Sequence, residues 1–359
     1  MDTAAHKIGM KTTQKATAAE KLALLESGQK EPSYTQLLKM ADAYHRPVIT
    51  FYLSKPPAQG IRGGDFRKLP DGFSREENAL LDALIRDIRA RQDMVRTLMV
   101  DEEEAEPLPF VNSITIDLGV KAVAKIIRET LGVTLANIRN CFDKASVFAL
   151  LREKAEDLGI FVLLIGDLGS HHSDIGTDIF RGYAIADSIA PFIVINDNDS
   201  KGAWAFTLLH ELTHLWLGAE GVSNSTVWAE SKLEKFCNDV ASEILLGEGE
   251  IESLPVSPNS AQDEVEAVIQ EFSQVAKLSN TMVAYNLYKA NKLTWEQYNH
   301  LSQKFRQYWI DNKAVNKKKD GTGPTYTVIR RHRLGSSIIN FVGRMMREGA
   351  LTPTKAAKI

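Results

Sequence analysis

Two histidines four residues apart, His210 and His214, enclose the acid Glu211 in the pentapeptide His-Glu-Leu-Thr-His. On an α-helix, side chains four residues apart lie on one face, so both imidazoles can bind a single metal ion. Glu211 would then reach the attacking water without binding the metal, as in a metallopeptidase. The pentapeptide therefore predicts a zinc site that hydrolyses a peptide bond. The alternative is an ordinary helix with two surface histidines.

The residues on either side of the pentapeptide favour the metal site. Residues 205–209 and 215–217 are largely apolar, which is typical of a helix buried in a core. Gly218 follows as the predicted end of that helix. We therefore expect the two histidines on a buried helix.

A catalytic zinc ion usually has three protein ligands and one position open to water. Glu234 is the best candidate for the third ligand, because it lies in an amphipathic helical segment, residues 228–246, that follows the histidines. Asn238, one turn later on the same face, could hydrogen-bond the outer nitrogen of a ligating histidine. The rivals for the third position are Glu230, Asp239 and Glu243, and Cys237 is a less favoured donor.

Residues 206–214 and 234–246 together resemble the ImmA/IrrE family of zinc metallopeptidases, whose pattern is F-T-x-x-H-E-x-x-H followed by E-x-x-A-N-x-F-A-x-x-L-L. The spacing from the second histidine to the glutamate also resembles that of gluzincin peptidases such as thermolysin. The resemblance implies that zinc is bound by His210, His214 and Glu234, and that Glu211 is the general base. The chain departs from the family pattern, at no ligand position, at Cys237, Val240 and Gly247.

The resemblance also implies a biological role. Substrates of this family are regulatory proteins, typically helix-turn-helix repressors whose cleavage derepresses stress, mobile-element or phage genes. The alternative function is a DNA-binding regulator or antitoxin-like protein with a non-catalytic zinc fold. Glu211 argues against that alternative, because a purely structural zinc site has no need of a carboxylate that does not bind the metal and is usually closed by four protein ligands. Manganese or iron could replace zinc in a site of two imidazoles and one carboxylate.

The first block, residues 1–57, resembles the second half of an Xre-type helix-turn-helix domain. Gly28 and Pro32 predict a helix end and a new start, and residues 34–44 have the spacing of an apolar helical face. The block carries eight basic and five acidic side chains. This modest basic bias makes DNA binding possible, with protein docking as the alternative.

The rest of the chain predicts an α+β fold with a zincin-like core. Residues 58–140 read as a glycine-rich linker and a helical connector. Residues 141–256 hold a helix (145–158), three strands (160–165, 179–185 and 192–195) and then the two site helices. Residues 257–359 form an accessory helical region with helices over 264–278, 281–290 and 294–309.

Two features of the core stay open at this stage. The strand ending at residue 196 either holds an extended substrate or is a central structural strand. An oxyanion formed during hydrolysis needs a donor besides zinc, and the available types are His171, His172 and Tyr183.

Basic runs at 317–319 and 330–333 are either solvated loops or contacts for an acidic partner.

Composition predicts a cytoplasmic globular protein with no membrane segment. The formal net charge is -3 and the hydrophobic content 44%, so charge alone does not favour nucleic acid as a partner. The N-terminus lacks the apolar stretch of a signal peptide, and no run approaches membrane-spanning length. Cys141 and Cys237 are too few for a disulfide framework. The oligomeric state cannot be inferred.

Overall fold

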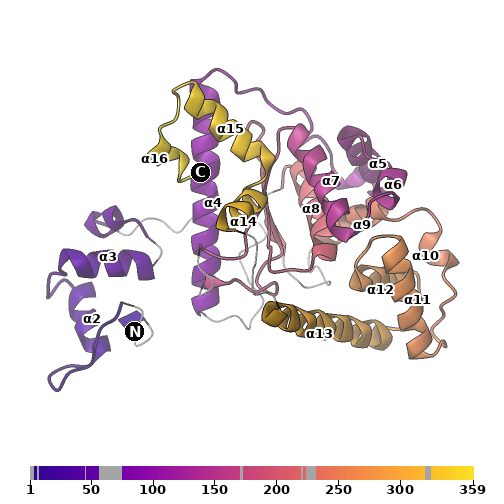
Figure 1. Cartoon of the computed structure of the whole chain (residues 1–359), viewed down its shortest axis with the longest axis horizontal. Coiled ribbons are helices and arrows are strands. Elements are labelled where there is room, and N and C mark those ends of the chain that lie inside the picture. Colours follow the sequence, from indigo (N-terminus) through magenta and orange to yellow (C-terminus); the bar gives the residue numbers. More distant parts are fainter. Residues whose placement is uncertain are drawn as a thin grey trace. The chain divides into compact units, whose positions relative to one another are not determined.

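The structure is a computed structural model that describes residues 4–5, 8–44, 46–55, 75–169, 173–219, 221–223, 232–319 and 325–359. The chain divides into two compact units, Met1–Ile61 and Arg62–Ile359. Each unit has a hydrophobic core of its own. Helices predominate beside one small sheet, so the protein has an α+β fold (Figure 1).

The first unit contains two short helices, α2 (Ala18–Glu26) and α3 (Tyr34–Ala43), followed by the 3-10 turn η1 (Val48–Tyr52). Gly28 has a φ of +72°, a conformation that favours glycine, and it turns the chain after α2 as the sequence predicted. A small core joins these elements. Its buried residues are Ala5, Ile8, Leu22, Leu25 and Met40.

Reciprocal hydrogen bonds fix the starts of both helices. The hydroxyl of Thr17 accepts from the backbone N–H of Glu20, whose carboxylate accepts from the backbone N–H of Thr17. Ser33 and Gln36 make the same exchange at the start of α3. Such capping boxes satisfy backbone donors that have no partner inside the helix. The boundaries of α2 and α3 therefore follow from local sequence.

The second unit is built on a sheet with the strand order β1-β3-β2-β4. Strands β1 (Phe161–Leu164) and β3 (Phe192–Ile195) are parallel. Strand β2 (Gly182–Ile185) runs antiparallel to β3 on one side and to β4 (Gly221–Ser223) on the other. Because β3 is paired on both sides, it cannot accept an added strand. Of the two roles left open for residues 192–196, the central structural strand is correct.

One face of the sheet packs against the helices that carry the histidines and their neighbours. These are α5 (Val120–Leu131), α7 (Lys144–Asp157), α8 (Lys201–Leu217) and α9 (Lys232–Leu245). Strand side chains alternate between faces. Those on this face are Val162, Leu164, Ala184, Ile193 and Ile195.

The opposite face is covered by the long helix α4 (Arg75–Asp101) and by α15 (Ser336–Arg347), with the short α16 (Pro353–Ala356) beside them (Figure 1). The strand residues on this face are Phe161, Leu163, Tyr183, Ile185, Phe192 and Val194. Strands β1, β2 and β3 are thus buried on both sides, which explains why their sequences read as nearly continuous apolar runs.

The remaining helices border this core. The turn η2 (Ile116–Leu118) leads into α5, and α6 (Leu135–Arg139) contacts α9. Helix α10 (Glu250–Ser253) precedes the accessory region, in which α11 (Gln262–Val275) and α13 (Trp295–Lys319) both pack on α12 (Asn280–Lys289) (Figure 1). The predicted helices of this region are observed, with the last one longer than expected.

The two basic runs lie in α13 and α14 (Tyr326–Leu334), so the prediction that they are loops is wrong.

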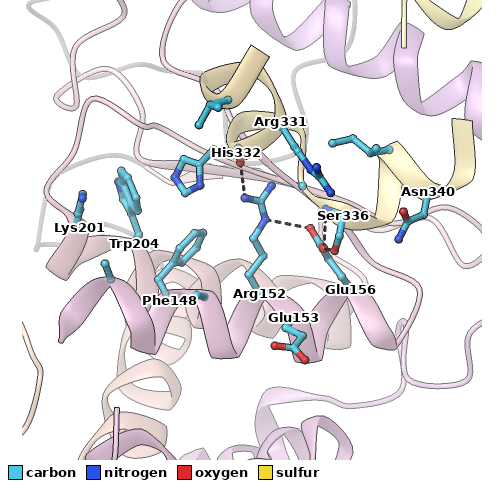
Figure 2. A pocket seen from close by; sticks show the side chains of 15 residues that line it. Phe148, Arg152, Glu153, Glu156, Lys201, Trp204, Arg331, His332, Ser336 and Asn340 are labelled. Atoms are coloured by element: carbon cyan, nitrogen blue, oxygen red, sulfur yellow. Dashed lines mark hydrogen bonds and ion pairs between the residues drawn. The ribbon is translucent and has the colours of Figure 1, made fainter. Parts of the chain in front are cut away.

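A buried ion pair on α7 attaches α14 and α15 to the sheet (Figure 2). The guanidinium of Arg152 lies 3.0 Å from the carboxylate of Glu156 and donates to the backbone carbonyl of His332 near the end of α14. Glu156 in turn accepts from the backbone N–H groups of Ser336 and Ser337, the first residues of α15. Arg152 therefore satisfies a backbone carbonyl at the end of α14, and Glu156 satisfies two backbone N–H groups at the start of α15.

Candidate metal centre

Helix α8 carries both histidines and is almost entirely buried. It ends at Gly218, whose φ of +65° is the left-handed conformation predicted for a helix stop. His210 is 3% exposed and His214 is 1% exposed. Their Nε2 atoms lie 3.1 Å apart. The alternative of two surface histidines is therefore wrong.

Glu234, near the start of α9, meets both imidazoles. One carboxylate oxygen lies 3.2 Å from Nε2 of His210, and the other lies 3.0 Å from Nε2 of His214. Helices α8 and α9 pack closely along their lengths, which brings the three side chains together. The structure thus places the predicted set of His210, His214 and Glu234 in one cluster.

Two of the rival acids, Asp239 and Glu243, do not join this cluster. Asp239 forms an ion pair with Lys289 on α12. Glu243 lines a separate groove between α5, α9 and α12, where its charge acts on Lys121. Glu230 lies outside the described residues. Glu234 is therefore the acid that the geometry favours.

Cys237 is a second possible donor, one turn after Glu234. Its buried Sγ and one ring nitrogen of each histidine all lie within 4.8 Å of one another. The carboxylate oxygens of Glu234 reach 3.0–3.2 Å from the two Nε2 atoms. A zinc ligand set needs donor atoms about 3.3 Å apart at tetrahedral bond lengths near 2.0–2.1 Å. We therefore favour Glu234 over Cys237 as the third donor.

Asn238 orients one of the rings. Its Oδ1 lies 2.9 Å from Nδ1 of His210. An amide oxygen accepts hydrogen bonds, so in the neutral ring Nδ1 carries the proton and the lone pair of Nε2 faces Glu234. Among the described residues, none accepts a hydrogen bond from Nδ1 of His214. The predicted orienting contact is thus present on one of the two histidines.

The donor set fits a divalent cation. Without a positive charge between them, the lone pair on Nε2 of His210 and the carboxylate of Glu234 would repel each other in a buried site. Two imidazole nitrogens and a carboxylate also form the usual three-ligand set of a catalytic zinc site. A cation or protons must therefore balance this cluster.

Protons balance it when no cation is bound. Burial alone lowers the pKa of His210, but the hydrogen bond and charge of Glu234 outweigh burial and raise it above its usual value. Burial likewise raises the pKa of Glu234, but the hydrogen bonds from His210 and His214 outweigh it, so that the pKa falls far below its usual range. The carboxylate is thus charged at neutral pH, as a ligand must be.

Glu211 is completely buried beside the two histidines. Its negative charge contributes to the raised pKa of His210, which shows that the acid acts on the same site. Its side chain packs against Gly182 on β2. An acid at this place, next to the donor cluster on α8, can exchange a proton with a reacting group bound there.

Of the oxyanion donors suggested by the sequence, Tyr183 does not lie at the site. Tyr183 belongs to the core on the opposite face of the sheet, where Arg89 lies over its ring. It cannot reach a substrate beside α8, so that suggestion is wrong. His171 and His172 lie outside the described residues.

Comparison with known proteins supports the family resemblance. Residues 155–288 match the Peptidase_M78 family model, described as the IrrE N-terminal-like domain. The matched range runs from the end of α7 into α12 and contains the sheet, α8 and α9. Neither the curated proteins nor the solved structures that were searched include a match. The family match supports a metallopeptidase-type function for this part of the chain.

Among the described residues, no helix combines the length and the apolar character needed to cross a bilayer.

Proposed function

We propose that the second unit is a zinc-dependent endopeptidase. In this proposal His210, His214 and Glu234 hold the metal, and Glu211 is the general base. The observation that carries the proposal is the convergence of two imidazole nitrogens and one carboxylate, 3.0–3.2 Å apart, from two adjoining helices. The match of residues 155–288 to a metallopeptidase family supports it independently.

The chain's own residues divide the work of hydrolysis. Bound zinc supplies a Lewis acid that polarises the scissile carbonyl and makes water easier to deprotonate. Glu211 takes a proton from the attacking water and later delivers it to the leaving amine. Asn238 holds the ring of His210 with its Nε2 lone pair turned inward. Burial of these groups strengthens each electrostatic interaction among them.

The proposed substrate is a regulatory protein, a helix-turn-helix repressor of stress, mobile-element or phage genes. Family resemblance supports this substrate class. The two capped helices of the first unit are compatible with the Xre-like segment expected there, through which DNA could be a partner.

Co-expression with the repressor encoded nearby tests the proposal. Wild type and Glu211→Gln are compared, because glutamine keeps the size of the side chain but cannot take up the proton. We expect repressor fragments with the wild type alone. Equal derepression by both proteins without cleavage would favour the alternative, a DNA-binding regulator with a non-catalytic zinc fold.

A second measurement separates peptidase activity from substrate choice. A library of unstructured peptides is incubated with each zinc-loaded protein, and new N-termini are identified by mass spectrometry. Cleavage by the wild type but not by Glu211→Gln supports an endopeptidase whatever the natural substrate. Absence of new termini with both proteins contradicts it for peptides of this kind.

A further inference from the structure

Strand β2 turns its small residues toward α8. Ala184 and Ala186 pack in the core that contains α8, whereas Tyr183 and Ile185 pack on the opposite face of the sheet. By the two-residue alternation of a strand, Gly182 lies on the α8 side. Strand β2 and α8 are in direct contact. Small residues on this side let the helix come close to the sheet.

Gly182 lies directly against the side chain of Glu211. A Cβ added to Gly182 would be 2.7 Å from Cδ and 2.8 Å from Cγ of Glu211, and closer still to Oε1. Non-bonded carbon atoms normally stay about 3.5–4.0 Å apart. Alanine at residue 182 and Glu211 in its present conformation therefore exclude each other.

Backbone conformation gives no other reason for a glycine at this place. Gly182 is not among the glycines with positive φ, and it takes part in regular pairing with Ile195 on β3 and Ser223 on β4. A glycine inside a strand weakens the strand unless something approaches it closely. Here the approaching group is the side chain of Glu211.

We propose that Gly182 is a positioning residue for Glu211. The missing side chain creates the space in which the carboxylate sits, and the backbone of β2 forms one wall of that space. A methyl group there would displace the acid, while the three metal-binding side chains on α8 and α9 keep their mutual contacts. The catalytic consequence rests on the proposed peptidase function, but the steric relation between Gly182 and Glu211 does not.

A double-mutant cycle in the full-length protein tests the steric relation without any activity assay. Gly182→Ala is introduced into wild type, Glu211→Gln and Glu211→Ala, and the urea midpoint of unfolding is measured. We expect Gly182→Ala to lower the midpoint in wild type and in Glu211→Gln, where the side chain keeps its size. The shift should disappear in Glu211→Ala, where the overlapping atoms are gone. Equal shifts in all three backgrounds would overturn the proposal.

Gly343→Ala serves as the matched control. This glycine lies in α15 and has no positive φ, and its added Cβ would meet no atom within 4 Å apart from its chain neighbours and the nearby backbone of its own helix. Its effect on the urea midpoint should be the same in all three Glu211 backgrounds. The control therefore separates a specific clash from a general effect of replacing glycine by alanine.

Kinetics test the catalytic consequence. We expect Gly182→Ala to keep the zinc content of the wild type and to lose about 100-fold or more in kcat, with KM changed much less, because a positioned general base contributes about 10²–10⁴-fold. Gly343→Ala should keep the wild-type kcat. Unchanged kcat in a folded Gly182→Ala protein would contradict the positioning role. If the wild type itself has no activity, the proposed function fails, and the stability cycle still decides the role of Gly182.

Discussion

At the scale of single residues, the site depends on a choice between two donors one turn apart on α9. Glu234 has an oxygen within 3.0–3.2 Å of Nε2 of each histidine, and the Sγ of Cys237 lies within 4.8 Å of a ring nitrogen of each. We expect Glu234→Ala to lose bound zinc and Cys237→Ala to keep one zinc ion per chain, measured by elemental analysis after gel filtration. Loss of zinc in Cys237→Ala with retention in Glu234→Ala would identify the thiol as the third ligand.

Asn238 makes a prediction of its own. Removal of its hydrogen bond to Nδ1 of His210 should weaken zinc binding about 10–100-fold, the usual effect of losing a group that orients a ligand. Competition with a chelator of known affinity measures the change in Asn238→Ala. Asp239→Asn is the control, because the neighbouring side chain turns away to Lys289 and should leave zinc affinity unchanged.

Zinc binding should depend on pH in a predictable direction. The raised pKa of His210 in the metal-free protein means that its ring stays doubly protonated, as imidazolium, to higher pH than a free imidazole, whose pKa is about 6.5. Zinc must displace that proton, so affinity should fall as the pH drops, by up to about tenfold per pH unit for each proton released. Calorimetry in buffers of different ionisation enthalpy counts the protons. Binding without proton release would contradict the raised pKa of His210.

The sequence predicted most of these residues because helical periodicity is local information. Spacing of four placed His210 and His214 together, and the amphipathic pattern placed Glu234 and Asn238 on one face. Gly182 was missed, since its role depends on which strand lies under α8. A signal was present in the alternation of small residues at 182, 184 and 186. That pattern indicates close packing on one strand face but does not name the partner.

At the scale of elements, the pair of Arg152 and Glu156 holds α14 and α15 against the sheet. Both side chains are less than one-tenth exposed. We expect Arg152→Met to lower the free energy of unfolding by about 3–5 kcal/mol, because it leaves a buried carboxylate without its cation. Urea denaturation followed by circular dichroism measures the loss.

The double variant gives the control for this ion pair. The double variant Arg152→Met with Glu156→Gln should lose less stability than the sum of the two single changes, because it leaves no unpaired charge at this ion pair. Additive losses would show that the two side chains stabilise the fold independently.

Elements were predicted well where their patterns are local. The strands near 160–165, 179–185 and 192–195 and the helix over 145–158 are observed within a few residues of the expected ends. Strand order was not predicted, because pairing depends on contacts between segments distant in the sequence. For the same reason the sequence left the role of residues 192–196 open and offered Tyr183 as an oxyanion donor, although it faces away from α8.

At the scale of the whole molecule, the two compact units have separate cores. The donor cluster, Glu211 and Gly182 all belong to the second unit. We expect a fragment of residues 62–359 to fold and to bind zinc with the affinity of the full chain, measured by thermal unfolding and chelator competition. A fragment that is unfolded or lacks zinc would show that the second unit depends on the first.

The most direct test of the central claim is X-ray absorption at the zinc edge of the zinc-loaded full-length protein. We expect two imidazole nitrogens and oxygen donors at about 2.0–2.1 Å, and no sulfur. A sulfur donor at about 2.3 Å, or zinc bound without two imidazoles, would contradict the site on which the proposed peptidase rests.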